Sequence, residues 1–258
     1  MKLSTILLYS TTDYRWLNLC LEKITKVSNE VIIPMCSHFF NGEPENQELL
    51  DKSIKIIKNY PSVKMYNFDW SPGQNNFYWE GVARILGTLE INKSNNWVLY
   101  LDTDEIIDPL KFQEWVNSKQ HEQYDSIKLS NYWYFRDIKY QATTYEDSIV
   151  LVRKDIVTDG INTIINPNVS RGREQCHEML DVRKIRNVKG VNGKPMIHHY
   201  SWVRTKDEML KKISTWGHNK DRNWVELVEE EFSREFNGTD FIHVYTYKTV
   251  NNFISLKS

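Results

Sequence analysis

The chain has 258 residues, which is enough for one α/β domain with a sizeable core or for two small domains at most. Its hydrophobic content of 40% and its charged content of 26% are ordinary for a globular protein. The 33 basic and 34 acidic residues leave a formal net charge of -1, so the chain has no overall basic field of the kind that attracts nucleic acid or an anionic membrane.

Predicted strands and helices alternate through the first part of the chain. Short apolar runs predict strands at 3–10, 30–36, 62–70 and 97–101, and apolar positions at helical spacing predict helices between them, at 13–24, 46–60 and 77–91. Strands separated by single helices indicate βαβ units, and hence an α/β fold with a mostly parallel central sheet and flanking helices. Ligands bind to such sheets beyond the carboxyl ends of the strands.

The pattern loosens after Pro109. Apolar stretches at 124–137, 147–155 and 194–203 predict longer strands, antiparallel or mixed. Residues 161–180 are rich in turn-forming residues and predict a loop. A capping box formed by Thr205 and Glu208 predicts a helix start, and a further helix is expected at about 223–236. Because no repeat, low-complexity tract or linker interrupts the chain, the sequence predicts a single domain over residues 1–258.

The sequence lacks the usual signals for export and for membrane insertion. Its N-terminal apolar stretch is short and predicts a first strand rather than a signal peptide. No apolar run approaches the roughly 18 residues that a membrane span needs. Three widely spaced cysteines (Cys20, Cys36 and Cys176) are typical of a reducing compartment. A cytoplasmic protein without a transmembrane segment is therefore expected.

The predicted strand at 97–101 ends in a cluster of carboxylates. In an extended chain residues two apart point the same way, so Asp102 and Asp104 are expected to face one side, and Thr103 and Glu105 the other. Two close carboxylates disfavour each other's ionisation unless a cation neutralises them, and oxygen ligands suit Mg²⁺ or Mn²⁺. A cation held in this way can bridge two phosphate oxygens. The alternative is an acidic strand-to-helix junction in which Asp104 or Asp108 caps the next helix.

The segment "NNWVLYLDTDEIIDP" resembles the region around the DxD motif in glycosyltransferases of the GT-A fold, especially family 2-like ones. The preceding "SPGQNNFYWEGVARILGTLE" resembles their helix with an Arg shortly before a Gly. The opening "ILLYSTTDYRWLNLCLEKI" resembles their first strand and helix, and "IHHYSWVR" resembles a later block. These blocks span residues 3–212. The resemblance implies a GT-A (Rossmann-like) fold, with a nucleotide-sugar-binding half at 1–108 and an acceptor-side half with C-terminal helices at 109–258.

The resemblance also implies roles for individual residues. Asp104 and His199 would bind the metal ion, Mn²⁺ or Mg²⁺, and Asp102 would contact the ribose or support the metal through water. Arg84 would meet the donor diphosphate, although it can equally pair with Glu80 one helical turn away. The remaining donor contacts are expected from Thr11, Thr12, Asp13, Thr103 and Arg204.

Three of these assignments have open alternatives. In a strand only one of His198 and His199 faces the site, and without the resemblance a core or surface histidine is the default interpretation. Arg204 and Lys206 either screen the leaving nucleoside diphosphate or are ordinary surface charges. Relatives often end the second strand in an acidic residue that reads the base, whereas this chain has no acid there until Glu43, so Thr12 or Asp13 would share that role.

Transfer with inversion needs a carboxylate that removes a proton from the acceptor hydroxyl. Glu178 follows His177 in "REQCHEML", and such a pair resembles the acceptor-side base of related transferases. Glu146 and Asp147 in "TYED" are the alternatives. Each of these carboxylates could also be an ordinary solvated charge.

The predicted function is therefore a metal-dependent glycosyltransferase that moves a sugar from a nucleoside diphosphate donor to a hydroxyl of a glycan, lipid or protein. A nucleotidyltransferase also uses paired aspartates and a metal. Such an enzyme usually carries a Gly-rich basic loop near its first strand, however, and "YSTTDYRW" contains no glycine. The third possibility is a nucleotide-sugar-binding module without catalysis.

Overall fold

The alternating N-terminal part of the chain forms the parallel side of one large sheet. In this computed structural model, which describes residues 1–159, 172–179, 181–216, 218–251 and 253–254, the elements follow the predicted order. They are β1 (Leu3–Leu8), η1 (Thr11–Asp13), α1 (Tyr14–Ile24), β2 (Glu30–Met35), α2 (Gln47–Ile57), β3 (Val63–Asn67), α3 (Asn76–Leu89) and β4 (Trp97–Asp102). Neighbouring strands in the order β3-β2-β1-β4 are all parallel, which confirms the predicted βαβ units.

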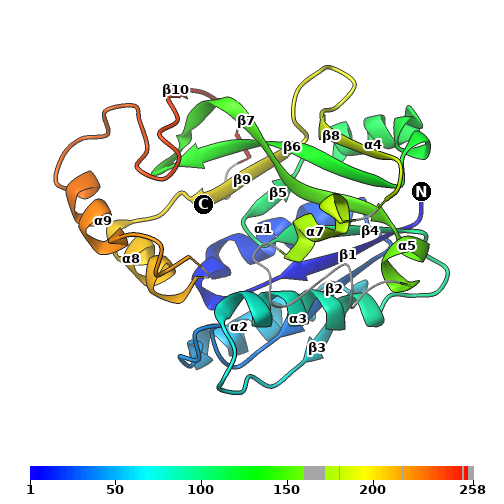
Figure 1. Cartoon of the computed structure of the whole chain (residues 1–258), viewed down its shortest axis with the longest axis horizontal. Helices are drawn as coiled ribbons and strands as arrows, with labels where there is room; N and C mark the ends of the chain where they lie inside the picture. The colour runs from blue at the N-terminus through cyan, green and yellow to red at the C-terminus, as the bar shows by residue number, and fades with distance from the viewer. Residues whose placement is uncertain (160–171, 180, 217, 252, 255–258) are drawn as a thin grey trace.

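The second part of the chain extends the same sheet with strands of both directions. These are β5 (Glu105–Ile107), β6 (Ser126–Phe135), β7 (Asp137–Arg153), β8 (Lys184–Val188), β9 (Ile197–Trp202) and β10 (Tyr247–Thr249). β7 pairs antiparallel with β4, and the sheet continues through β6 and β9 to β5. The sheet is therefore mixed, and strands β1 to β4 from the N-terminal part of the chain form one side of it, which is all parallel (Figure 1).

The later helices are α4 (Pro109–Asn117), η2 (Gln120–Gln123), α5 (Lys154–Asp159), α7 (Gly172–Glu178), α8 (Lys206–Thr215) and α9 (Trp224–Phe232). The predicted capping box is present at the start of α8, where Thr205 and Glu208 bond each other's backbone N–H groups. Most of the predicted loop at 161–180 lies outside the described residues, and its described end forms α7. None of the helices that the structure describes is both long and apolar enough to cross a membrane.

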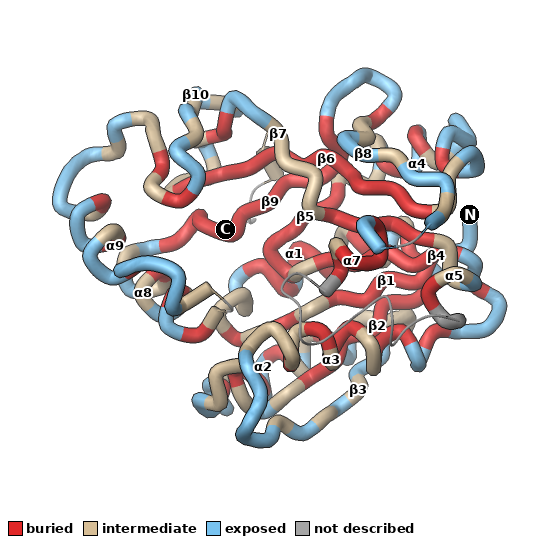
Figure 2. Tube along the Cα trace, viewed as in Figure 1, coloured by how far each residue is buried: buried red, intermediate tan, exposed pale blue. Residues whose placement is uncertain are grey.

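The core occupies both faces of the sheet, as the buried strands at the centre of Figure 2 indicate. On β1, Leu3 and Leu7 belong to one buried cluster and Ile6 to another, as the alternation of a strand requires. Gly87 allows α3 to lie directly against the sheet, because a Cβ atom there would be 2.8 Å from Cγ2 of Ile6. This close approach brings Arg84, on the same helix, to the carboxyl end of the parallel strands, beside Asp102.

Candidate active site

The acid cluster follows a turn rather than an extended strand. β4 ends at Asp102, a turn occupies Thr103 and Asp104, and β5 begins at Glu105. The expected alternation is therefore wrong beyond Asp102: Asp102 and Glu105 approach the same guanidinium, that of Arg173, whereas Asp104 meets other partners. The hydroxyl of Thr103 is buried and donates to the backbone carbonyl of Leu8 at 2.7 Å, which fixes the turn to β1.

Two buried arginines hold Asp102. Nη1 of Arg84 lies 2.6 Å from Oε1 of Glu80, which is the pairing within the helix that the sequence offered as the alternative. Nη2 of Arg84 lies 2.8 Å from Asp102 Oδ1, a contact that was not predicted. Nη1 of Arg173 lies 3.6 Å from the other oxygen of Asp102. The Asp102 side chain nevertheless keeps 32% of its surface exposed, so it can still contact a ligand.

Arg173 also forms a buried, two-pronged ion pair with Glu105. Its two terminal nitrogens lie 2.6 and 2.7 Å from the Glu105 oxygens, and the Glu105 side chain is completely buried. One of these oxygens also accepts from the backbone N–H of Asp102 at 2.8 Å. Burial alone would lower the pKa of Arg173, but the negative charges of Asp102 and Glu105 outweigh burial and raise it. Arg173 was not among the predicted site residues, although it is the first residue of the segment "REQCHEML" that contains Glu178.

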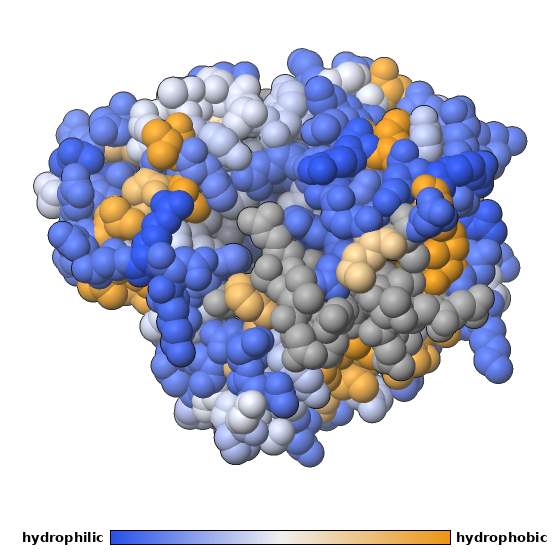
Figure 3. All heavy atoms as spheres, in the orientation of Figure 1, coloured by the Kyte–Doolittle hydropathy of each residue, from blue (hydrophilic) through white to orange (hydrophobic). Residues whose placement is uncertain are grey.

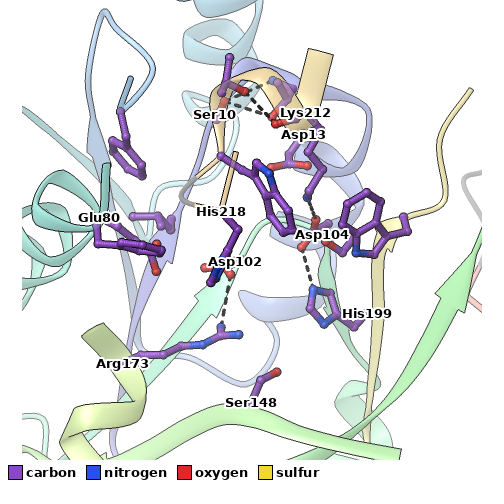
Figure 4. A pocket seen from close by; sticks show the side chains of 18 of the residues that line it. Ser10, Asp13, Glu80, Asp102, Asp104, Ser148, Arg173, His199, Lys212 and His218 are labelled. Atoms are coloured by element: carbon purple, nitrogen blue, oxygen red, sulfur yellow. Dashed lines mark hydrogen bonds and ion pairs between the residues drawn. The ribbon is translucent and has the colours of Figure 1, made fainter. Parts of the chain in front are cut away.

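Asp104 is surrounded by three nitrogen-bearing side chains. Its Oδ1 lies 3.4 Å from Nε2 of His199, and its Oδ2 lies 3.2 Å from Nζ of Lys212 and 3.6 Å from Nη2 of Arg204. Burial acts to raise the pKa of Asp104, but the charge of Lys212 and the contacts with His199 and Arg204 hold it well below its usual range. Asp104 is therefore ionised although it is buried (Figure 4).

The two adjacent histidines of β9 face opposite ways. Nδ1 of His198 shares a 2.7 Å hydrogen bond with the hydroxyl of Tyr134 in the core, and burial lowers the pKa of His198 to about 3. His199 instead faces Asp104, as Figure 4 shows. Its Nδ1 is buried, has no hydrogen-bond partner within the described residues and lies 3.7 Å from Glu105. A metal-binding histidine is usually oriented by a hydrogen bond from its second ring nitrogen, and Glu105 is the nearest carboxylate to Nδ1 but lies beyond hydrogen-bond distance.

The Asp104–His199 pair fits a divalent cation. Two ligand atoms at about 2.1 Å from one octahedral cation are roughly 3 Å apart, and the observed separation of 3.4 Å is close to this value. Within the described residues no three His, Cys, Asp or Glu side chains are grouped to hold a metal by themselves. A cation at this pair would therefore need further ligands from a bound phosphate or from water.

These groups line a cavity of about 1030 Å³, seen as the hollow among largely hydrophilic residues in Figure 3. Ligand pockets of roughly 300–1,000 Å³ usually hold one small molecule, so this volume leaves room for a donor and part of an acceptor. Of the predicted site residues, those that line it are Thr12, Asp13, Arg84, Asp102, Asp104, Glu178 and His199. Thr11, Thr103 and Arg204 lie behind the lining: Thr11 bonds Glu45, and Arg204 bonds Asp13 and the Thr12 carbonyl.

One end of the cavity has a carboxylate that the sequence analysis did not identify. Glu45 is buried and accepts a hydrogen bond from the backbone N–H of Thr11 at 3.1 Å and another from the Thr11 hydroxyl. Burial raises the pKa of Glu45 to about 6. The sequence places the first acid after β2 at Glu43, but that side chain pairs with Lys211 on the surface. The loop after β2 instead brings Glu45 to the start of η1, just after β1.

The cavity lining also contains the three carboxylates considered as a base, Glu146, Asp147 and Glu178. Glu178 is 53% exposed and lies 3.6 Å from Arg186. Asp147 is held by Arg186 at 2.9 Å; although burial acts to raise its pKa, Arg186 and Lys128 lower it below its usual value. Glu146 is 17% exposed and lies 3.5 Å from Nε2 of His243.

The ring of Trp133 contacts both His199, beside Asp104, and His243, beside Glu146. The edge of Trp133 meets the rings of His199 and His243, with centroids 4.7 and 5.2 Å apart. Burial and the charge of Glu146 raise the pKa of the neighbouring Tyr245 to about 12. Glu146 therefore lies among aromatic side chains, next to His243 and Tyr245.

No protein-family model and no curated protein matches the chain. Its structure is similar to the crystal structure of residues 1–349 of S. aureus TarS, with a TM-score of 0.51 at 14% identity over 91% of this chain and 73% of that one. It is also similar to the mannosyltransferase PcManGT from Pyrobaculum calidifontis, solved with GDP-Man and Mn²⁺, with a TM-score of 0.53 at 8% identity. That match covers 83% of this chain and 61% of the other. Both neighbours have the GT-A fold, and so does this chain.

Proposed function

We propose that this protein is a glycosyltransferase that moves a sugar from a nucleoside diphosphate donor to a hydroxyl of an acceptor, with inversion. The observation that carries the proposal is the Asp104–His199 pair at the end of β4, inside a cavity large enough for two substrates. It lies at the carboxyl ends of the parallel strands, where sheets of this kind bind ligands. The GT-A fold of the chain supports the same function, and so does the GDP-Man bound to the mannosyltransferase neighbour.

Different residues of the site would contact different parts of the donor. Thr12 and Asp13 face the end of the cavity next to Glu45, which suits the nucleoside. Arg84, held between Glu80 and Asp102, would contact the diphosphate or hold the Asp102 carboxylate in position for the ribose. Asp104 and His199 would hold Mn²⁺ or Mg²⁺, and a cation there would supply positive charge to the leaving diphosphate. Thr11, Thr103 and Arg204 would support these contacts from behind the cavity wall.

The transfer itself makes one bond and breaks one. An acceptor oxygen attacks the anomeric carbon, the bond from that carbon to the diphosphate breaks, and the acceptor proton passes to a carboxylate. The sequence assigns this carboxylate to Glu178, which lines the cavity. Glu146 is the alternative base that the structure favours, because it is more buried than Glu178 and lies beside His243, whose ring contacts Trp133. Asp147 is less suited, since its depressed pKa makes it a weaker base.

Replacement of Glu178 by Gln is expected to leave donor binding unchanged and to reduce transfer about 10²–10⁴-fold, the usual contribution of a general base. Donor affinity by calorimetry and single-turnover transfer rates measure the two effects separately. Glu146→Gln and Asp147→Asn are the matched variants. Normal transfer by Glu178→Gln together with a large loss in Glu146→Gln would assign the proton to Glu146.

The proposed function is tested by incubating the protein with Mn²⁺ and a panel of nucleoside diphosphate sugars. Slow release of the nucleoside diphosphate from one donor, by transfer to water, is expected even without the natural acceptor. If no donor in a panel covering the common bases and sugars is turned over, the transferase proposal is wrong. A cytoplasmic setting and a glycan, lipid or protein acceptor remain predictions.

A further inference from the structure

Lys212 is a cation that the proposed reaction has not yet used. It lies in the last turn of α8, yet its Nζ reaches across the cavity to within 3.2 Å of Asp104 Oδ2 (Figure 4). Its side chain is only 13% exposed. Asp104 and His199 are the pair that fits a divalent cation, so Lys212 places its charge on one of the proposed metal ligands.

The two cations beside Asp104 differ in how firmly they are held. Arg204 donates to the carbonyls of Ser201 and Thr12, at 2.8 and 2.5 Å, and to the carboxylate of Asp13. Within the described part of the chain, the ammonium group of Lys212 donates one hydrogen bond, to Asp104. A lysine also has a flexible four-carbon stem, whereas the fork of an arginine is rigid. Lys212 can therefore leave Asp104 by breaking one hydrogen bond and weakening its attraction to Asp13, whereas Arg204 would lose its bonds to Ser201, Thr12 and Asp13.

Lys212 and a divalent cation cannot share Asp104 at low cost. A cation bound between Asp104 and His199 would lie within a few ångströms of the ammonium group, and like charges at that distance repel strongly inside a protein. A bound nucleoside diphosphate would offset this repulsion, because it brings negative charge that Lys212 and the divalent cation can both neutralise. Once Lys212 has left Asp104, its ammonium group could form an ion pair with the bound diphosphate.

We propose that the ammonium group of Lys212 neutralises Asp104 in the donor-free protein, through the carboxylate oxygen that does not face His199, and moves to the donor diphosphate when metal and nucleotide bind together. The proposal rests on the proposed function, because it assumes a metal and a nucleoside diphosphate in this cavity. Its consequence is cooperative binding. Free Mn²⁺ binds weakly because it must displace Lys212, and the nucleotide strengthens Mn²⁺ binding by giving Lys212 another partner.

The test measures Mn²⁺ binding by electron paramagnetic resonance at one fixed pH, with and without UDP or GDP. In the unchanged protein, the nucleotide is expected to increase Mn²⁺ affinity by a factor in the usual range for coupled sites, about 5–150-fold. In Lys212→Met, the affinity for Mn²⁺ alone should rise about tenfold or more, the affinity for the nucleotide should fall, and most of the coupling should disappear.

Two further variants control for folding and for general charge effects. Lys211→Met removes a charge from the same helix, but Lys211 is 47% exposed and pairs with Glu43, so this variant should behave like the unchanged protein. Lys212→Arg keeps the charge and should retain the coupling. Equal Mn²⁺ affinity and coupling in the unchanged protein and Lys212→Met would overturn the inference and leave the proposed function standing. If neither protein binds Mn²⁺ or any nucleoside diphosphate, the proposed function itself fails.

Discussion

Replacing Asp104 by Asn is expected to reduce sugar transfer by at least about a thousandfold. A divalent cation contributes several kcal/mol of charge stabilisation to such a reaction, and each 1.4 kcal/mol changes the rate about tenfold. Asp104 is ionised although buried, and it is the carboxylate that lies 3.4 Å from His199. Release of the nucleoside diphosphate from the donor in the presence of Mn²⁺ measures the effect.

Asp108→Asn is the matched control. Asp108 belongs to the same run of acids but caps α4 by accepting from the backbone N–H of Lys111, and it lies outside the cavity lining. Asn is as good a helix cap as Asp, so this variant should keep its activity. Equal turnover by Asp104→Asn and Asp108→Asn would contradict the assignment of Asp104.

Replacing Arg173 by Met is expected to lower the free energy of unfolding by about 3–5 kcal/mol, because it leaves Glu105 charged, buried and unpaired. Asp102 would also lose one of the two arginines that hold it. Urea unfolding followed by circular dichroism gives the change in stability, and donor binding reports the effect on Asp102.

A double-mutant cycle separates the ion pair from the packing of Arg173. Glu105→Gln in the Arg173→Met background removes the unpaired charge, so the double variant should be more stable than Arg173→Met alone. The two-pronged contact of 2.6 and 2.7 Å predicts that Arg173 and Glu105 are energetically coupled. Additive losses of stability from the two changes would contradict this prediction.

The sequence predicted the N-terminal part of the fold well, because its elements are set by local patterns. Apolar runs and helical spacing placed β1, α1, β2, α2 and α3 within a few residues of their observed bounds. The mixed pairing of β5 to β9 was only partly predictable. β6 pairs with β7, β8 and β9, and nothing in a local pattern states which strand lies next to which.

The site shows the same division between local and distant information. The acid cluster and its place at a strand end were readable, but the turn at Thr103 was not, and it separates Asp104 from Asp102 and Glu105. Lys212 contacts Asp104 across 108 positions of sequence, and Arg173 contacts Glu105 across 68. The loop that returns Glu45 to Thr11 spans 34. Such contacts depend on tertiary packing, which a single sequence does not display.

The most direct test of the account is a thermal-shift screen of nucleoside diphosphates and their sugars, with and without Mn²⁺, on the unchanged protein and on Asp104→Asn. A ligand that binds only the folded state raises the melting temperature by mass action. We expect one nucleotide to raise it in a Mn²⁺-dependent manner, its sugar conjugate to raise it further, and Asp104→Asn to lose the Mn²⁺ dependence. If no nucleotide changes the melting temperature under either condition, the cavity is not a donor site, and Asp102 and Asp104 are structural acids at the end of a strand.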